Sequence, residues 1–186
     1  MEKVSSKLII KNMGQYYYGV ILTKDKSDII AWDRSRGGGS KLTEHSWMEN
    51  EFVKSFENLI YNNPMPVVWA GDYADPENGL DEGPNLHDLC TNKTEVKPEK
   101  ELDTAYSRYV INHDTKQYVD KHKMLKDDEG WQMHPLPLLT AEGNGRGGGD
   151  YRGDSELIGI WARCFISVSE KKPEGYEELI CDFVDR

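Results

Sequence analysis

Cysteine is scarce, and none of it is spaced for a metal site or a redox pair. The 186 residues contain three cysteines, Cys90, Cys164 and Cys181, and no C-x-x-C pair. An odd number of widely separated cysteines disfavours a disulfide framework. We therefore expect reduced, buried thiols, which are typical of a protein in a reducing compartment.

Long apolar runs are missing as well. No apolar stretch approaches the roughly 20 residues that cross a bilayer, and the mean hydropathy is −0.73. The first twelve residues carry Lys3, Lys7 and Lys11 but no cleavage pattern of a signal peptide. The sequence thus predicts no membrane association and a cytoplasmic location.

Positive charge is the third shortage, and one long stretch has none. The chain has 33 acidic and 23 basic residues, a formal net charge of −10. No Lys or Arg occurs from Ser55 to Asn92, where the acidic residues are Glu57, Asp72, Asp75, Glu77, Asp81, Glu82 and Asp88. Such a balance disfavours direct binding to nucleic acid. It is typical either of solubility alone or of a protein that docks on a basic surface.

Catalytic signatures are absent too. There is no G-x-S-x-G or H-E-x-x-H motif. Gly143–Gly148 matches G-x-G-x-x-G, but a dinucleotide site needs a strand before it and a helix after it. Here Pro135 and Pro137 precede the glycines and a strand pattern follows. Although His87 and Cys90 are three residues apart, a catalytic dyad usually draws its members from distant segments.

Two loop segments hold the only candidate metal ligands. Asp72 and Asp75 lie in one loop, and Glu142, Asp150 and Asp154 flank the glycine-rich stretch. Carboxylates that met there would suit Mg²⁺ or Ca²⁺. Because nothing in the spacing forces the loops together, solvated carboxylates remain the alternative.

Aromatic residues, by contrast, are plentiful. Five Trp and ten Tyr argue against disorder, because large rings bury much apolar area per residue. A chain of this length forms one domain of ordinary size, residues 1–186. Core positions are expected for Trp32, Trp47, Trp69, Trp131 and Trp161, with one of the first two partly exposed.

The apolar pattern predicts an α+β fold built on a mainly antiparallel sheet. Strands are expected over 16–23, 28–32, 66–70, 107–112, 117–120, 157–168 and 178–184. A bulge is expected at Ala162–Arg163. Prolines and glycines predict little regular structure over 133–152. More strands than helices, without regular βαβ alternation, favour antiparallel pairing and long glycine-rich loops.

One principal helix is expected over residues 46–61. Ser46 and Glu49 have the spacing of a capping box. One face carries the apolar residues Met48, Phe52, Phe56, Leu59 and Ile60. The following Asn-Asn-Pro ends the helix.

Four segments carry a resemblance to known proteins. They are 13–17 (MGQYY), 44–47 (EHSW), 69–75 (WAGDYAD) and 134–153 (HPLPLLTAEGNGRGGGDYRG). Together they resemble a family of mostly uncharacterised proteins from Clostridia, related bacteria and their phages, along most of the chain after Met13. The chain is also similar to a phage-encoded anti-CRISPR protein that inhibits type II-A Cas9. The resemblance carries over no catalytic residue and no cofactor.

The resemblance and the charge together favour an inhibitor in the cytoplasm of a bacterial host cell. It would bind a defence nuclease such as the Cas9–guide RNA complex and block DNA binding or cleavage. Its expected contact residues are Asp72, Asp75, Glu77, Asp81 and Glu82, with Arg146 and Arg152 of the glycine-rich loop as a second contact.

An enzyme is the alternative. It would be a metal-dependent hydrolase or a nucleotide-modifying protein built around Gly143–Gly153, where glycines alternate with acidic and arginine side chains. Its weakly indicated metal ligands would be Asp72, Asp75, Glu142 and Asp150. Convergence of these residues on a pocket would favour the enzyme, and a dispersed acidic face would favour the inhibitor.

Overall fold

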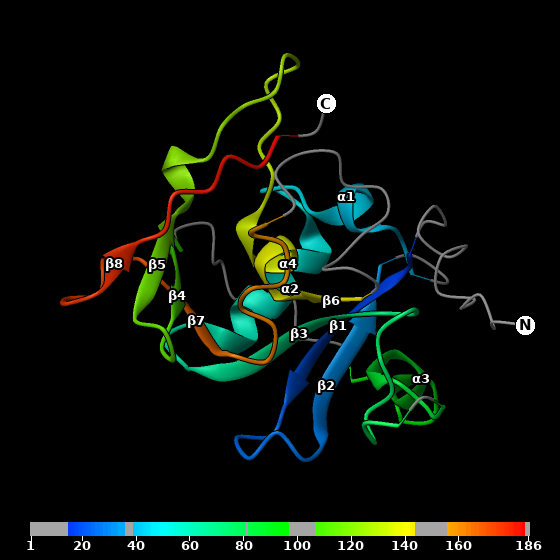
Figure 1. Cartoon of the computed structure of the whole chain (residues 1–186). Helices are drawn as coiled ribbons and strands as arrows, with labels where there is room; N and C mark the ends of the chain where they lie inside the picture. Colours follow the sequence, from blue (N-terminus) through cyan, green and yellow to red (C-terminus); the bar gives the residue numbers. More distant parts are fainter. Residues whose placement is uncertain (1–14, 36–38, 81, 97–106, 144–155, 185–186) are drawn as a thin grey trace, which may run out of the picture.

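A computed structural model of the chain describes residues 15–35, 39–80, 82–96, 107–143 and 156–184 (Figure 1). The strands are β1 (Tyr17–Leu22), β2 (Ile29–Arg34), β3 (Met65–Gly71), β4 (Tyr109–Asn112), β5 (Gln117–Asp120), β6 (Ala141–Glu142), β7 (Phe165–Ser169) and β8 (Glu177–Glu178). The helices are α1 (Leu42–His45), α2 (Glu51–Ile60), α3 (Leu86–Thr91), the 3-10 turn η4 (Lys121–Lys123) and α4 (Pro135–Thr140).

The strands form one mostly antiparallel sheet in the order β2-β1-β3-β7-β4-β5-β8. The short β6 pairs with the second half of β3, and β7 pairs with the first half. The pairings β3–β6 and β5–β8 are parallel. This confirms the predicted α+β class with a mainly antiparallel sheet.

Alternating residues of the central strands bury two different faces. Val67 and Trp69 of β3 join the larger core cluster with α2 and α4, whereas Val68 and Ala70 join the smaller one beneath α3. Because successive side chains of a strand point to opposite faces, a strand covered on both sides reads as continuously apolar. On the larger side, the ring of Phe56 lies on Gly19, where an added Cβ would be 2.6 Å from the ring.

The principal helix is confirmed, but it starts later than expected. Its N-cap is Asn50, whose Oδ1 accepts hydrogen bonds from the backbone N–H groups of Phe52 (2.9 Å) and Val53 (3.3 Å). Ser46 does not cap it, because Ser46 follows the last residue of α1 and its buried hydroxyl donates to the carbonyl of Leu42 (2.6 Å). The expected single helix is therefore a short turn followed by α2.

The prediction that residues 133–152 lack regular structure is wrong at its start. Pro135 is the first residue of α4, a position whose N–H has no partner within a helix in any case. His134 caps the helix by accepting from the N–H of Leu136 (3.1 Å) through Nδ1. The six residues of α4 are all buried.

The long strand expected over 157–168 is also wrong in its first half. Only Phe165–Ser169 is strand, and residues 157–164 form successive turns. Ile158 and Trp161 are buried at a spacing of three residues. The apolar residues of this segment therefore pack into the core from turns and not from a β-strand. Arg163, in the expected bulge, has a left-handed φ of 63°. Of the last expected strand, residues 178–184, only the first residue belongs to a strand, in β8, which pairs with β5.

Trp131 departs from its expected place in the core. Its side chain is 56% exposed, whereas Trp69 and Trp161 are fully buried and Trp32 is 5% exposed. Trp131 belongs to residues 124–133, which project away from the sheet at the top of Figure 1. The sheet therefore cannot cover it.

Candidate functional site

The base-free stretch folds in part into a lobe beside the sheet, residues 72–80 and 82–92, which we call the acidic lobe. Asn85 anchors it, since its side-chain amide donates to the carbonyls of Asp72 (3.1 Å) and Ala74 (3.2 Å). The same side chain caps α3 by accepting from the N–H of Asp88 (2.9 Å). This double role fixes the loop after β3 against the start of α3.

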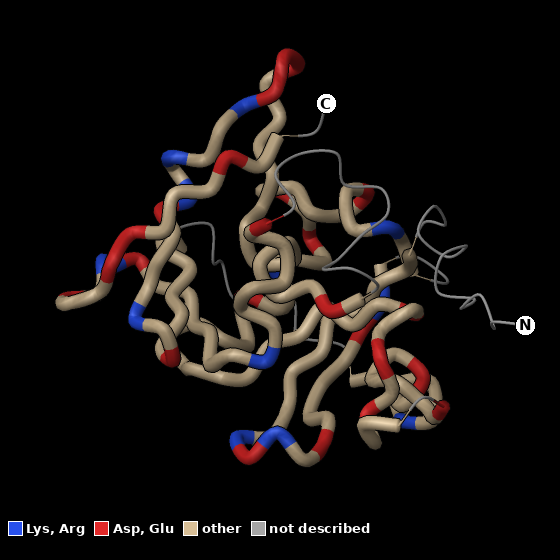
Figure 2. The backbone as a smooth tube through the Cα atoms, viewed as in Figure 1, with Lys and Arg blue, Asp and Glu red and all other residues tan. Residues whose placement is uncertain are grey.

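The predicted acidic residues of the lobe differ in exposure. Asp75 and Glu82 are exposed, and neither forms an ion pair within the described residues. Asp72 is half-buried and accepts from the N–H of Tyr16 (3.1 Å), and burial raises the pKa of its carboxyl. Figure 2 shows acidic residues along this segment, around α3. Asp81 lies outside the described residues.

Glu77 and Glu142, expected at two different sites, meet at one arginine. Nε of Arg163 donates to Glu142 Oε2 (2.7 Å), and its Nη2 reaches both Glu142 Oε1 (2.6 Å) and Glu77 Oε1. Nη1 donates to Glu77 Oε2 (2.9 Å). The hydrogen bonds to both carboxylates raise the pKa of Arg163. The two acidic segments thus converge, but around a guanidinium.

This geometry bears directly on the metal hypothesis. Both oxygens of Glu142 are occupied by Arg163, so a cation there would have to displace a guanidinium. Within the described residues, no group of three or more His, Cys, Asp and Glu is arranged to hold a metal ion. Asp150, Asp154, Arg146 and Arg152 lie outside the described residues.

Three of the segments that carry the resemblance meet where β1 begins and β3 and β6 end. Gln15 is buried there and accepts from the hydroxyl of Tyr17 (3.4 Å). Its Oε1 is 2.9 Å from the place a Cβ would take on Gly71, and 2.2 Å from that on Gly143. A side chain at either position would displace the end of the Gln15 side chain, so the two glycines leave room for Gln15 to fill this space.

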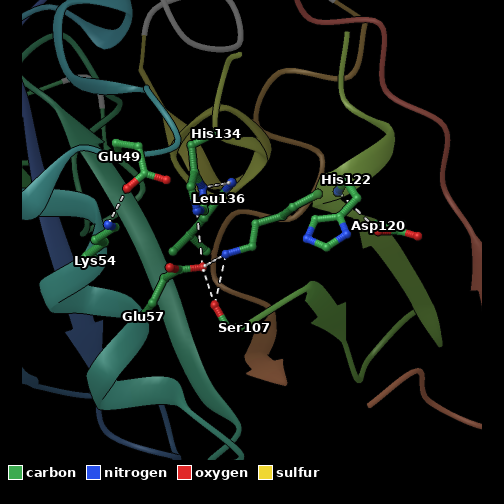
Figure 3. A network of polar contacts seen from close by, with 9 residues as sticks. Glu49, Lys54, Glu57, Ser107, Asp120, His122, His134 and Leu136 are labelled. Atoms are coloured by element: carbon green, nitrogen blue, oxygen red, sulfur yellow. Dashed lines mark hydrogen bonds and ion pairs between the residues drawn. The ribbon is translucent and has the colours of Figure 1, made fainter. Parts of the chain in front are cut away.

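A buried polar network lies between α2 and the loop before α4 (Figure 3). Glu57 Oε1 accepts from Lys121 Nζ (2.6 Å), His134 Nε2 (3.1 Å) and the Ser107 hydroxyl (3.2 Å). Lys121 also donates to Ser107 (2.9 Å). The side chain of Glu57 is 2% exposed, and that of His134 is 0% exposed.

The electrostatics of this network favour a carboxylate beside a neutral imidazole. Burial opposes ionisation of Glu57, but His134 and Lys121 outweigh it and lower its pKa to about 2. Burial lowers the pKa of His134. Nδ1 of His134 accepts a hydrogen bond from a backbone N–H, so the proton of the neutral ring lies on Nε2. This Nε2–H donates a hydrogen bond to Glu57. The imidazole lone pair that base catalysis by His134 would need is therefore engaged by the N–H of Leu136.

His45 forms a second buried chain of hydrogen bonds. Trp69 Nε1 donates to His45 Nε2 (2.8 Å), so Nδ1 carries the proton and donates to the Ser40 hydroxyl (2.9 Å). Burial lowers the pKa of His45 to about 4. A Ser–His nucleophile needs the opposite polarity, with the imidazole accepting from the serine. This chain therefore fixes the strand β3 to α1 and does not activate Ser40.

The His87 and Cys90 pair adds no reactive thiol. The ring of His87 stacks on Tyr18, with ring centroids 3.8 Å apart. Cys90 is fully buried, and burial raises the pKa of its thiol to about 12. The thiol is therefore protonated at neutral pH and unsuited to nucleophilic attack. Cys164 and Cys181 are free as well, the former half-buried.

Sequence reasoning missed the roles of Glu57 and Arg163. One signal for Glu57 was present, because residues 53, 56, 57 and 60 form the buried stripe of α2 and Glu57 takes an apolar position in it. A carboxylate on such a stripe requires a buried partner. No comparable signal marks Arg163, which lies among apolar residues in a turn.

Comparisons with known proteins give no family to this chain. No protein-family model, curated protein or solved structure matches it. Among the described residues, no helix is long and apolar enough to cross a membrane.

Proposed function

We propose that this protein is a phage or mobile-element inhibitor that binds a bacterial defence nuclease through the acidic lobe and blocks DNA binding or cleavage. The proposed partner is the Cas9–guide RNA complex. Such a complex holds its nucleic acids in a positively charged channel. An acidic surface is attracted to this channel and competes there with DNA.

The observation that carries the proposal is the exposure of Asp75 and Glu82 on an anchored lobe that lacks any basic residue. A lobe held by Asn85 presents these charges in a fixed arrangement, which reduces the entropy lost on binding. Glu77 contributes less than expected, because its carboxylate is paired with Arg163. Among the described residues of the expected contact set, this leaves Asp75 and Glu82, with the half-buried Asp72 at the margin.

The enzyme alternative has less support. In its metal-dependent form it would use Glu142 as a ligand, and this carboxylate is paired with Arg163. Thermal melting with Mg²⁺, Mn²⁺, Ca²⁺ and a nucleotide panel tests it, because a ligand that binds the folded state raises the melting temperature. A rise of several degrees in the melting temperature with any of these ligands would support the enzyme alternative.

The inhibitor proposal is tested by charge reversal in the lobe. The double variant Asp75→Lys/Glu82→Lys should fold normally, since exposed substitutions rarely change stability by more than about 0.5 kcal/mol. Inhibition of Cas9 cleavage should be lost, with the fall in binding mainly in the association rate. For the unmodified protein, binding should weaken as salt rises, because exposed charges are screened over about 8 Å at physiological ionic strength.

A matched control changes the same charge elsewhere. Glu174→Lys/Asp182→Lys replaces two exposed acidic residues outside the lobe and should leave inhibition intact. Equal loss in both variants would mean that only net charge matters. No binding of the unmodified protein to the Cas9–guide RNA complex, with undiminished cleavage, would end the proposal.

A further inference from the structure

Residues 124–133 form a hairpin arm whose ends, Met124 and Met133, are buried in the core and whose tip projects from the body of the protein (Figure 1). Lys126 and Gln132 form a β-bridge near its base, and the Gln132 side chain donates to the carbonyl of Met124 (2.7 Å). The N–H of Asp127 donates to the carbonyl of Trp131 (2.9 Å) across the arm. At the base, the N–H of Met48 also donates to the carbonyl of Gln132 (3.2 Å), which ties the arm to the body of the protein.

Asp127 organises the tip of the arm from inside. One oxygen of its carboxylate accepts from the N–H groups of Trp131 (2.8 Å) and Glu129 (2.9 Å). The N–H of Gly130 donates to the Asp127 carbonyl (3.0 Å), and Gly130 has a φ of 88° that favours glycine. These bonds fix the backbone that carries Trp131, so the side chain is presented from a preformed turn.

Trp131 is the largest exposed aromatic side chain of the described residues. Its indole is 56% exposed and is supported on one side by an edge contact with Trp47, with ring centroids 5.7 Å apart. Tryptophan is one of the residues most enriched among binding hot spots. Within the described residues, cations lie over Phe165, Tyr109 and Tyr118, and none lies over Trp131.

The charges beside the indole indicate what it binds. Asp128 and Glu129 are exposed, and Lys126 is the one basic residue of the arm. Figure 2 shows acidic residues at the tip of the arm. Carboxylates repel the phosphates of a nucleic acid, so stacking of a base on Trp131 is disfavoured. They attract a guanidinium, which pairs with carboxylates and stacks on an indole face.

We propose that the arm binds an arginine-bearing segment of a protein partner. One guanidinium stacks on Trp131, and Asp128 and Glu129 pair with the same or a neighbouring arginine. This goes beyond the proposed function and does not rest on it, because the tip of the arm, at the top of Figure 1, lies far from α3 of the acidic lobe. A partner that contacted both would be held at two separate points.

The test uses a defined probe, a short peptide of alternating Arg and Gly. The ¹⁵N-labelled protein is titrated with it, and the indole N–H resonance of Trp131 is followed. We expect that resonance to shift with the arginine peptide and not with a matched peptide in which citrulline, which is uncharged, replaces arginine. Trp131→Ala should weaken peptide binding about tenfold, the loss typical of an aromatic hot spot.

Further variants separate the parts of the arm. Trp131→Phe should restore part of the affinity, because a smaller ring still attracts a cation. Asp128→Asn/Glu129→Gln should weaken binding about threefold, and the remaining binding should depend less on salt. Ile30→Ala, a truncation of another exposed apolar residue on β2, should change nothing.

Three results would overturn the inference. One is an equal response to the citrulline peptide, and another is unchanged affinity of Trp131→Ala. The third is a Trp131 shift caused by single-stranded DNA or by raising the protein concentration alone, which would assign the arm to nucleic acid or to a second copy of the chain. None of these measurements uses Cas9, so they test the arm even if the protein does not inhibit Cas9.

Discussion

The carboxylates of the Glu57 network and those of the acidic lobe differ in what faces them. Glu57 is enclosed by Lys121, His134 and Ser107 and is removed from solvent. Asp75 and Glu82 are exposed, and neither forms an ion pair within the described residues. All three count equally in a net charge of −10, yet only the latter two can act on a partner. Net charge therefore overstates the acidic surface.

The comparison predicts opposite responses to truncation. Glu57→Ala leaves the ammonium of Lys121 and the N–H of His134 without their buried acceptor. Breaking a buried ion pair from one side costs about 3–5 kcal/mol, so unfolding should occur at much lower urea concentration at pH 7. Glu82→Ala should change the free energy of unfolding by less than about 0.5 kcal/mol.

A double variant sharpens this first prediction. In Glu57→Leu/Lys121→Met both charges are removed together, and part of the stability should return, because apolar replacement of a buried pair is often nearly neutral. If Glu57→Ala and Glu82→Ala unfolded at the same urea concentration, the division between buried and exposed carboxylates would be wrong.

The second prediction concerns pH, and it extends the comparison to the buried histidines. Burial lowers the pKa of His45 from 6.5 to about 4. Between these values the unfolded chain binds more protons than the folded one, so stability falls as pH falls from about 6.5 to about 4. The loss attributable to His45 is on the order of 3 kcal/mol.

His134 acts in the same direction, because burial lowers its pKa too, and a difference measurement is needed to separate them. Unfolding free energies of the unmodified protein and of His45→Gln are measured from pH 7 to 4. The variant should have the shallower slope, while exposed lobe variants should keep the full slope. Parallel curves for His45→Gln and the unmodified protein would contradict the prediction.

The third and smallest expected effect concerns Arg163, which pairs with Glu77 and Glu142. Arg163→Ala removes charge-assisted hydrogen bonds to both and should destabilise by about 2 kcal/mol. Because Arg163 has a φ of 63°, Arg163→Gly should be less destabilising than the alanine variant by about 1 kcal/mol. Thermal unfolding of the two variants decides this, and alanine equal to or better than glycine would contradict it.

The main elements of the fold could be read from local pattern. Strands expected at 16–23, 66–70 and 117–120 are found at Tyr17–Leu22, Met65–Gly71 and Gln117–Asp120. These segments are rich in β-branched and aromatic residues, and turn residues bound them. Predictions were wrong for segments without such periodicity. One example is α4, where a histidine cap and a proline in the first turn allow a helix that composition alone disfavours.

The candidate site was predictable only in part. The sequence shows that the acidic lobe lacks basic residues, since this is a property of composition. It does not show that Glu77 and Glu142 pair with Arg163, because this partner is 86 and 21 residues away from them. Pairing over such separations depends on how β3, β6 and the turns before β7 are placed together.

The sequence by itself determined the α+β class, the helix α2 and the excess of negative charge, because periodicity and composition are local properties. Only the tertiary structure decided which charges remain available. It buried Glu57 against Lys121 and His134, and it placed Trp131 on an arm beyond the reach of the sheet. The physical reason is that burial and ion pairing depend on contacts between distant segments, and those contacts exist only once the sheet has formed.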